Sequence, residues 1–103
     1  MKKPLSVTIL ILASACVATK TIAPTQGALP FMQQKVPGIT LETADKGYVL
    51  YKDKCGACHR LHSPSEYTIS KWEQNLIEMY PKAKVANEEE KQLIRNYLFS
   101  LSK

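Results

Sequence analysis

Residues 41–103 are the part of this chain whose sequence predicts a folded domain, and they number only 63 of the 103 residues. A domain this short buries a small share of its surface, so its own side chains make a marginal core. Natural domains of this size gain the missing stability from disulfides, a metal ion or association with other chains. We therefore expect something besides the chain's own apolar side chains to complete the interior.

The first 15 residues have the pattern of an export signal. Lys2 and Lys3 precede an apolar run over residues 5–13, which is far shorter than the ~20 residues of a membrane-spanning helix. The small residues before Cys16 suit ordinary signal peptidase, and residues 12–16 also resemble a lipobox shifted by one position. We expect a lipoprotein signal, a lipid on the Cys16 thiol and a location in the periplasm or cell envelope. The alternative is a signal-peptide cysteine with no role.

The positive charge of the chain lies partly in this signal. Removing residues 1–15 takes away two lysines and lowers the formal charge from +5 to +3. The remainder has no stripe of basic residues interleaved with aromatics, so we expect no nucleic-acid partner. Lys52, Lys54 and Arg60 suggest a basic rim for a protein partner, or simply a solvated face.

Residues 16–40 contain three prolines and two glycines and show no amphipathic period. We expect a flexible, partly extended tether with a root-mean-square reach of roughly 25–30 Å. The alternative is that two of its apolar residues, Phe31 and Met32, dock on the domain. If the chain is a subunit of a larger exported oxidoreductase, the same two residues are the candidate interface.

The apolar spacing after residue 41 predicts helices. Thr43 is placed to cap a helix that continues to about Lys54, and the apolar groups of this helix are Tyr48, Leu50 and Tyr51. Gly47 in its interior costs ~1 kcal/mol relative to alanine. We therefore expect another backbone to pack closely against Gly47.

Two further helices follow. A capping box at residues 70–73 predicts the start of one, Pro81 predicts its end, and one of its faces carries Trp72, Leu76 and Met79. The last helix starts at Asn87, before three glutamates that suit a helix N-terminus. Its expected buried stripe is Leu93, Ile94, Tyr97, Leu98 and Leu101. Since no useful β-alternation occurs, we predict an all-α fold.

The motif that carries chemistry is Cys55, Gly56, Ala57, Cys58 and His59. This CxxCH pattern is the attachment signature of haem c. Its two thiols can add to the two vinyl groups of one porphyrin, and the adjacent histidine can ligate the iron. An apolar macrocycle would also complete the small core. We predict one covalent haem c on Cys55 and Cys58, with His59 as the proximal iron ligand.

Three other interpretations use the same atoms. A thioredoxin-like CxxC is expected in a βαβ setting, whereas the flanking pattern here is helical. A zinc site would crowd Cys55, Cys58, His59 and His62 into eight residues, although structural zinc sites use well-separated pairs. A disulfide suits an exported protein but leaves the adjoining histidine unexplained.

Residues 41–103 resemble a monohaem cytochrome c of the class I type. The likeness rests on Gly47, Tyr51 and Cys55, spaced Gly-x3-aromatic-x3-Cys before CxxCH, and on residues 93–98 near the end of the chain. It implies a small helical domain wrapped around one covalently attached haem. It also implies that the first and last helices of the domain cross in contact. Ile94 and Tyr97 hold the positions of the last helix that pack against Gly47 and Tyr51 in that family.

The resemblance also supplies candidates for the haem surroundings. A methionine usually binds the iron opposite the histidine, and Met79, 20 residues after His59, is the expected distal ligand. Alternatively, Met79 belongs to the core. The iron position opposite the histidine is then filled by Met32, by another group or by nothing. The Pro64 carbonyl is a candidate acceptor for the proximal histidine ring, or Pro64 is an ordinary turn residue.

Two nearby residues have open roles. We expect His62 to be an exposed loop histidine, with a place near a haem propionate as the alternative. Trp72 either packs at the haem edge or fills the core.

We therefore expect a non-enzymatic carrier of single electrons between a donor and an acceptor protein. Ligation by histidine and methionine raises the reduction potential and leaves no open iron position. The chain offers no paired carboxylates, serine–histidine set or second cofactor motif. One alternative is a haem-based sensor that binds a small gas at an open sixth position, and another is the cytochrome subunit of a larger oxidoreductase.

Overall fold

The computed structural model describes residues 22–57 and 60–103, and its elements are helical. The α-helices are α1 (Leu29–Lys35), α2 (Leu41–Leu50), α3 (Ile69–Lys82) and α4 (Glu88–Ser100). A π-helical turn, η1 (Tyr51–Cys55), continues α2, and a short 3-10 helix, η2 (Pro64–Glu66), precedes α3. No strand occurs in these residues, so the prediction of an all-α fold is confirmed for them.

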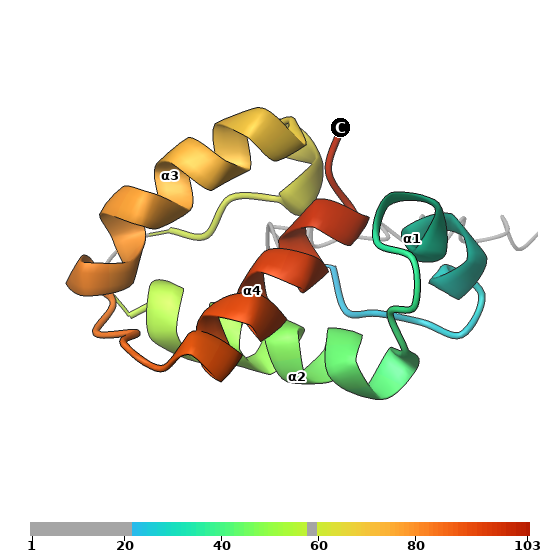
Figure 1. Cartoon of the computed structure of the whole chain (residues 1–103), viewed down its shortest axis with the longest axis horizontal. Coiled ribbons are helices and arrows are strands. Elements are labelled where there is room, and N and C mark those ends of the chain that lie inside the picture. The colour runs from blue at the N-terminus through green and yellow to red at the C-terminus, as the bar shows by residue number, and fades with distance from the viewer. Residues whose placement is uncertain (1–21, 58–59) are drawn as a thin grey trace, which may run out of the picture.

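The helices are arranged around α4. Figure 1 shows α4 crossing the middle of the molecule, with α2 along one side, α3 along the other and α1 at one end. Ile94, Tyr97 and Leu98 of α4 are fully buried, and Trp72 and Leu76 of α3 pack in the same cluster. The predicted buried stripe of the last helix is therefore confirmed at its centre, while Leu93 and Leu101 at its edges are half-buried.

The contact between α2 and α4 depends on Gly47. A Cβ atom at this position would lie 2.1 Å from the backbone oxygen of Leu93 and 2.8 Å from the Cβ of Tyr97. Only glycine permits backbones to approach this closely. The prediction that Gly47 marks a close backbone contact is confirmed.

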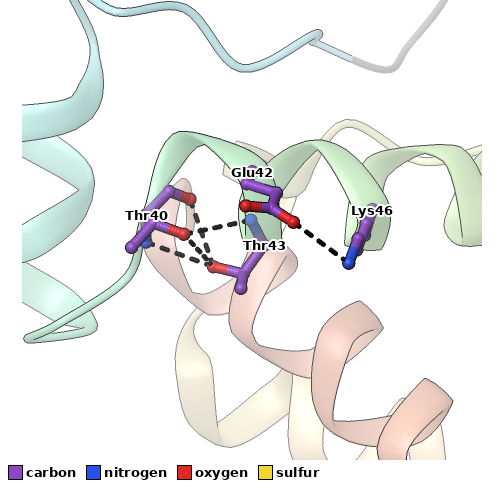
Figure 2. A network of polar contacts seen from close by, with 4 residues as sticks. All are labelled: Thr40, Glu42, Thr43 and Lys46. Atoms are coloured by element: carbon purple, nitrogen blue, oxygen red, sulfur yellow. Dashed lines mark hydrogen bonds and ion pairs between the residues drawn. The ribbon is translucent and has the colours of Figure 1, made fainter.

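The N-terminus of α2 differs from the prediction by three residues. Thr40, whose backbone is extended, is the N-cap, and Thr43 is the third helical residue. The two threonines form a reciprocal capping box, in which each side-chain oxygen accepts the other's backbone N–H, at 3.1 and 3.2 Å (Figure 2). Thr43 thus contributes to the cap from inside the helix, and Glu42 pairs with Lys46 one turn further on at 3.3 Å.

The caps of the later helices were predicted with mixed success. α3 begins after Thr68, which accepts from the backbone N–H of Lys71 at 3.2 Å, so the predicted start at Ser70 was wrong. The helix continues through Pro81 and ends at Lys82. Asn87 caps α4 as predicted, because its Oδ1 accepts from the backbone N–H groups of the two residues that follow Glu88.

Residues 22–40, here called the N-terminal strap, differ from the predicted flexible tether. They contain α1, and the side chain of Met32 is fully buried with Ile39 and Ala44. The hydroxyl of Tyr97 donates to the carbonyl of Ile22 at 2.5 Å, and Lys35 Nζ donates to the carbonyl of Ser102. The strap therefore packs on α2 and on the end of α4. A seven-residue helix that buries one side chain is too short to show an amphipathic period, which is why the sequence gives no sign of it.

The described residues contain no helix that is both long enough and apolar enough to cross a membrane. The predicted signal segment, residues 1–15, and the first residues of the predicted tether, 16–21, lie outside the described residues.

Candidate functional site

A cavity lies beside the end of η1 and is closed by residues 61–67 and by α3. Its volume is about 190 Å³, and it opens to solvent on one side. Most of its wall is aromatic or aliphatic, formed by Tyr51, Leu61, Tyr67, Trp72 and Leu76. A cavity of this kind suits a largely apolar ligand.

Two sulfur-containing side chains predicted as haem-binding residues line this cavity. Cys55 ends η1 and is 5% exposed, whereas Met79 lies one turn from the end of α3 and is half-buried. They are 24 residues apart in the sequence, and the return of α3 along the cavity brings them to one site. The other predicted site residues, Cys58, His59 and Cys16, lie outside the described residues, so their roles remain predictions.

Gly56 is a residue of the motif whose role the sequence did not reveal. A Cβ atom there would lie 2.4 Å from the backbone oxygen of Lys52 and 3.3 Å from a side-chain carbon of Leu61. The chain therefore turns tightly against η1 immediately after Cys55. A larger residue at position 56 would push the chain that follows Cys55 away from η1.

Two aromatic residues of the cavity wall donate hydrogen bonds to the segment that follows the motif. The Tyr51 hydroxyl donates to the His62 carbonyl at 2.7 Å, and the Trp72 indole N–H donates to the Pro64 carbonyl at 2.8 Å. Burial, reinforced by the nearby Cys55 thiol, raises the pKa of Tyr51 above its usual value, so the phenol stays protonated and remains a donor. The rings of Tyr51 and Trp72 meet edge to face, with centroids 6.1 Å apart.

The predicted roles of Trp72 and Pro64 can now be compared with their contacts. Trp72 is 4% exposed and belongs to the buried core cluster as well as to the cavity wall. The Pro64 carbonyl accepts from Trp72, and a carbonyl oxygen has a second lone pair. Its predicted bond to the proximal histidine remains a prediction, because His59 lies outside the described residues.

His62 lies at the rim of the cavity. Its side chain is 48% exposed, which confirms the prediction of an exposed loop histidine. Its Nδ1 is 2.7 Å from a carboxylate oxygen of Glu66, and its ring lies against Tyr67. The Glu66 carboxylate therefore orients this imidazole at the cavity entrance.

The basic residues near the motif do not form a bare positive rim. Lys54 pairs with Glu90 at the start of α4 at 3.4 Å, and the Lys52 ammonium lies over the Tyr48 ring, 5.2 Å from its centroid. Arg60 is exposed. The Lys54 charge is thus offset within the domain, which weakens the expectation of a basic docking face.

Metal binding by protein side chains alone was the basis of the zinc alternative. Within residues 22–57 and 60–103, no three histidine, cysteine or acidic side chains lie close enough together to hold a metal ion. Two of the four candidate zinc ligands, Cys58 and His59, lie outside these ranges, so the zinc alternative is not tested.

Comparison of the chain with models of protein families, with curated proteins and with solved structures finds no match.

Proposed function

We propose that this protein is an exported monohaem cytochrome c that carries single electrons between redox proteins. Cys55 and Cys58 would attach the haem, and His59 and Met79 would ligate its iron. The observation that carries the proposal is that Cys55 and Met79, selected from the sequence as haem-binding residues, line one predominantly apolar cavity.

The residues of the cavity fit a haem. The wall is mainly aromatic and aliphatic, as an apolar macrocycle requires, and a buried cysteine stands in it where a thioether would form. A thioether side chain, Met79, is available from α3 as an axial ligand. The folded part is still small after the strap adds Met32 to its core, and a covalently held haem would add further apolar packing.

A haem supplies an iron that takes up and releases one electron, and the chain's own residues set how it does so. Tyr51, Tyr67 and Trp72 would exclude water from one side of the site, which influences the potential through burial and local dielectric. A methionine ligand raises the potential further and fills the sixth position. A site closed in this way favours electron transfer over binding of a substrate.

The N-terminal strap changes the expected position of the domain relative to a membrane. If Cys16 carries a lipid, only residues 17–21 separate it from Ile22, where the chain is held by Tyr97. Six Cα–Cα steps span at most about 20 Å. The domain would thus stay at the membrane surface, and its redox partners would have to reach it there.

The structure weakens one argument for the alternative that the chain is a subunit of a larger oxidoreductase. Met32 is fully buried within its own chain and cannot serve as the interface suggested for residues 31 and 32. Phe31 is 51% exposed and is the remaining apolar residue of that candidate interface.

The proposal is tested by the absorption spectrum of the purified, oxidised protein. A haem c spectrum with the weak far-red band of methionine-ligated ferric iron is expected, and Met79→Ala should remove the band. Met32→Leu is the matched control, because Met32 lies in the separate strap cluster, and it should keep the band. A parent without haem would refute the proposal. A high-spin parent that binds carbon monoxide when reduced would favour the sensor instead.

A further inference from the structure

Two buried aromatic side chains from different elements hold the same short piece of chain. Tyr51 belongs to η1 and Trp72 to α3, yet their donors bind carbonyls only two residues apart, those of His62 and Pro64. Both rings are 4% exposed, and Pro64 is fully buried. The segment that leaves the CxxCH motif is thus held between the two helical elements that form the cavity.

We infer that Tyr51 and Trp72 are positioning residues that fix the chain directly after the motif. The inference rests on the proposed function in one respect, which is that His59 ligates the iron. His62 is three residues after His59, so the backbone between their Cα atoms spans at most about 11 Å. Anchoring the His62 and Pro64 carbonyls therefore limits where the histidine of the motif can lie.

The other end of the motif is anchored by different means. Cys55 is buried at the end of η1, and Gly56 permits the chain to pass close to the Lys52 carbonyl, where a Cβ atom would clash. The two aromatic donors complete this arrangement at the far end. The Pro64 carbonyl is buried and the bond to the His62 carbonyl is partly buried, so loss of either donor leaves an acceptor with a weaker partner and favours opening of the segment.

The first test is limited tryptic cleavage of the full-length protein as it is purified after export. Arg60 lies in the segment that follows the motif, and Lys84 lies outside it, in the α3–α4 connection, so cleavage after Lys84 reports loosening elsewhere in the chain. Tyr51→Phe removes only the hydroxyl. It should speed cleavage after Arg60 roughly two- to tenfold, the population change expected from one lost hydrogen bond, while cleavage after Lys84 is unchanged.

Tyr80→Phe is the matched control. The Tyr80 hydroxyl also donates to a backbone carbonyl, that of Lys91 at 3.2 Å, but on α4. It should leave cleavage after Arg60 at the parent rate. Trp72→Phe is the second variant, and it should accelerate the same site. The inference is overturned if Tyr51→Phe matches Tyr80→Phe, or if it accelerates both cleavage sites equally.

The reduction potential distinguishes a positioning role from a general loss of stability. A variant that is less stable but still folded should keep the potential of the parent. Loosening the segment admits water to the site, so Tyr51→Phe should make the potential more negative, and Tyr80→Phe should not. A potential unchanged by Tyr51→Phe would contradict the positioning of an iron ligand. If the parent carries no haem, the proposed function fails, whereas the cleavage comparison still decides whether the two aromatic donors hold the segment.

Discussion

Replacing Gly47 by alanine should destabilise the protein substantially, although alanine is the better helix former by ~1 kcal/mol. The new Cβ atom would stand 2.1 Å from the Leu93 carbonyl oxygen and 2.8 Å from the Cβ of Tyr97. The first of these neighbours is backbone, so the contact cannot be relieved by a side-chain rotation. Relief to an ordinary contact of 3.4 Å requires the two atoms to move apart by 1.3 Å, in the region where Ile94 and Tyr97 are fully buried.

Overpacking of this kind costs about 1–3 kcal/mol and occasionally more, and a clash with backbone belongs at the upper end. We expect Gly47→Ala to lower the free energy of unfolding by about 3 kcal/mol, measured by urea denaturation of the purified protein. Gly27→Ala is the matched control, because no atom lies within 4 Å of its added Cβ and its backbone has an ordinary φ. It should change stability by less than about 0.5 kcal/mol. Equal stability of the two variants would refute the close approach of α2 and α4.

Three further outcomes are expected. Met32→Ala should cost about 2–5 kcal/mol in urea denaturation because Met32 is fully buried, whereas Phe31→Ala, at a half-exposed neighbour, should cost less than about 0.5 kcal/mol; equal effects would show that the strap does not pack. Burial raises the pKa of Tyr80 to about 12, so its protonated form stabilises the fold fully below pH 10 and this contribution is lost as pH rises toward 12. Tyr80→Phe should therefore lose less stability than the parent between pH 10 and pH 12, and identical pH dependence would contradict this cause. Glu90→Gln should destabilise the fold less in high salt than in low salt, because its carboxylate pairs with Lys54 at 3.4 Å; equal losses at both salt concentrations would contradict this assignment.

The parts of the fold that were predictable from the sequence have local or pairwise causes. Asn87 caps α4 through its own side chain, and the buried stripe of α4 follows from helical spacing. Gly47 was informative because a glycine inside a helix is costly unless a close neighbour requires it. That neighbour proved to be the backbone at Leu93.

The parts that were missed depend on geometry that spacing does not encode. Thr40 and Thr43 are both candidate caps of α2, and which of them is the cap depends on which residue has an extended backbone. The burial of Met32 depends on a pocket made by α2 and the end of α4, far away in the sequence. The candidate site was partly predictable through Cys55 and Met79, but the hydrogen bond from Tyr51 to residue 62 requires the tertiary fold.

The central claim is most directly tested by whether haem stays on the chain when the protein is denatured. The full-length protein should be produced in an exporting host that attaches haem c, then unfolded, separated from free haem and weighed intact. We predict a mass increase of one haem that survives denaturation, a reduced increase or weaker attachment in Cys55→Ala and Cys58→Ala, and none when both are replaced. A chain whose mass shows no bound haem, or one that releases all its haem on unfolding, would contradict the account.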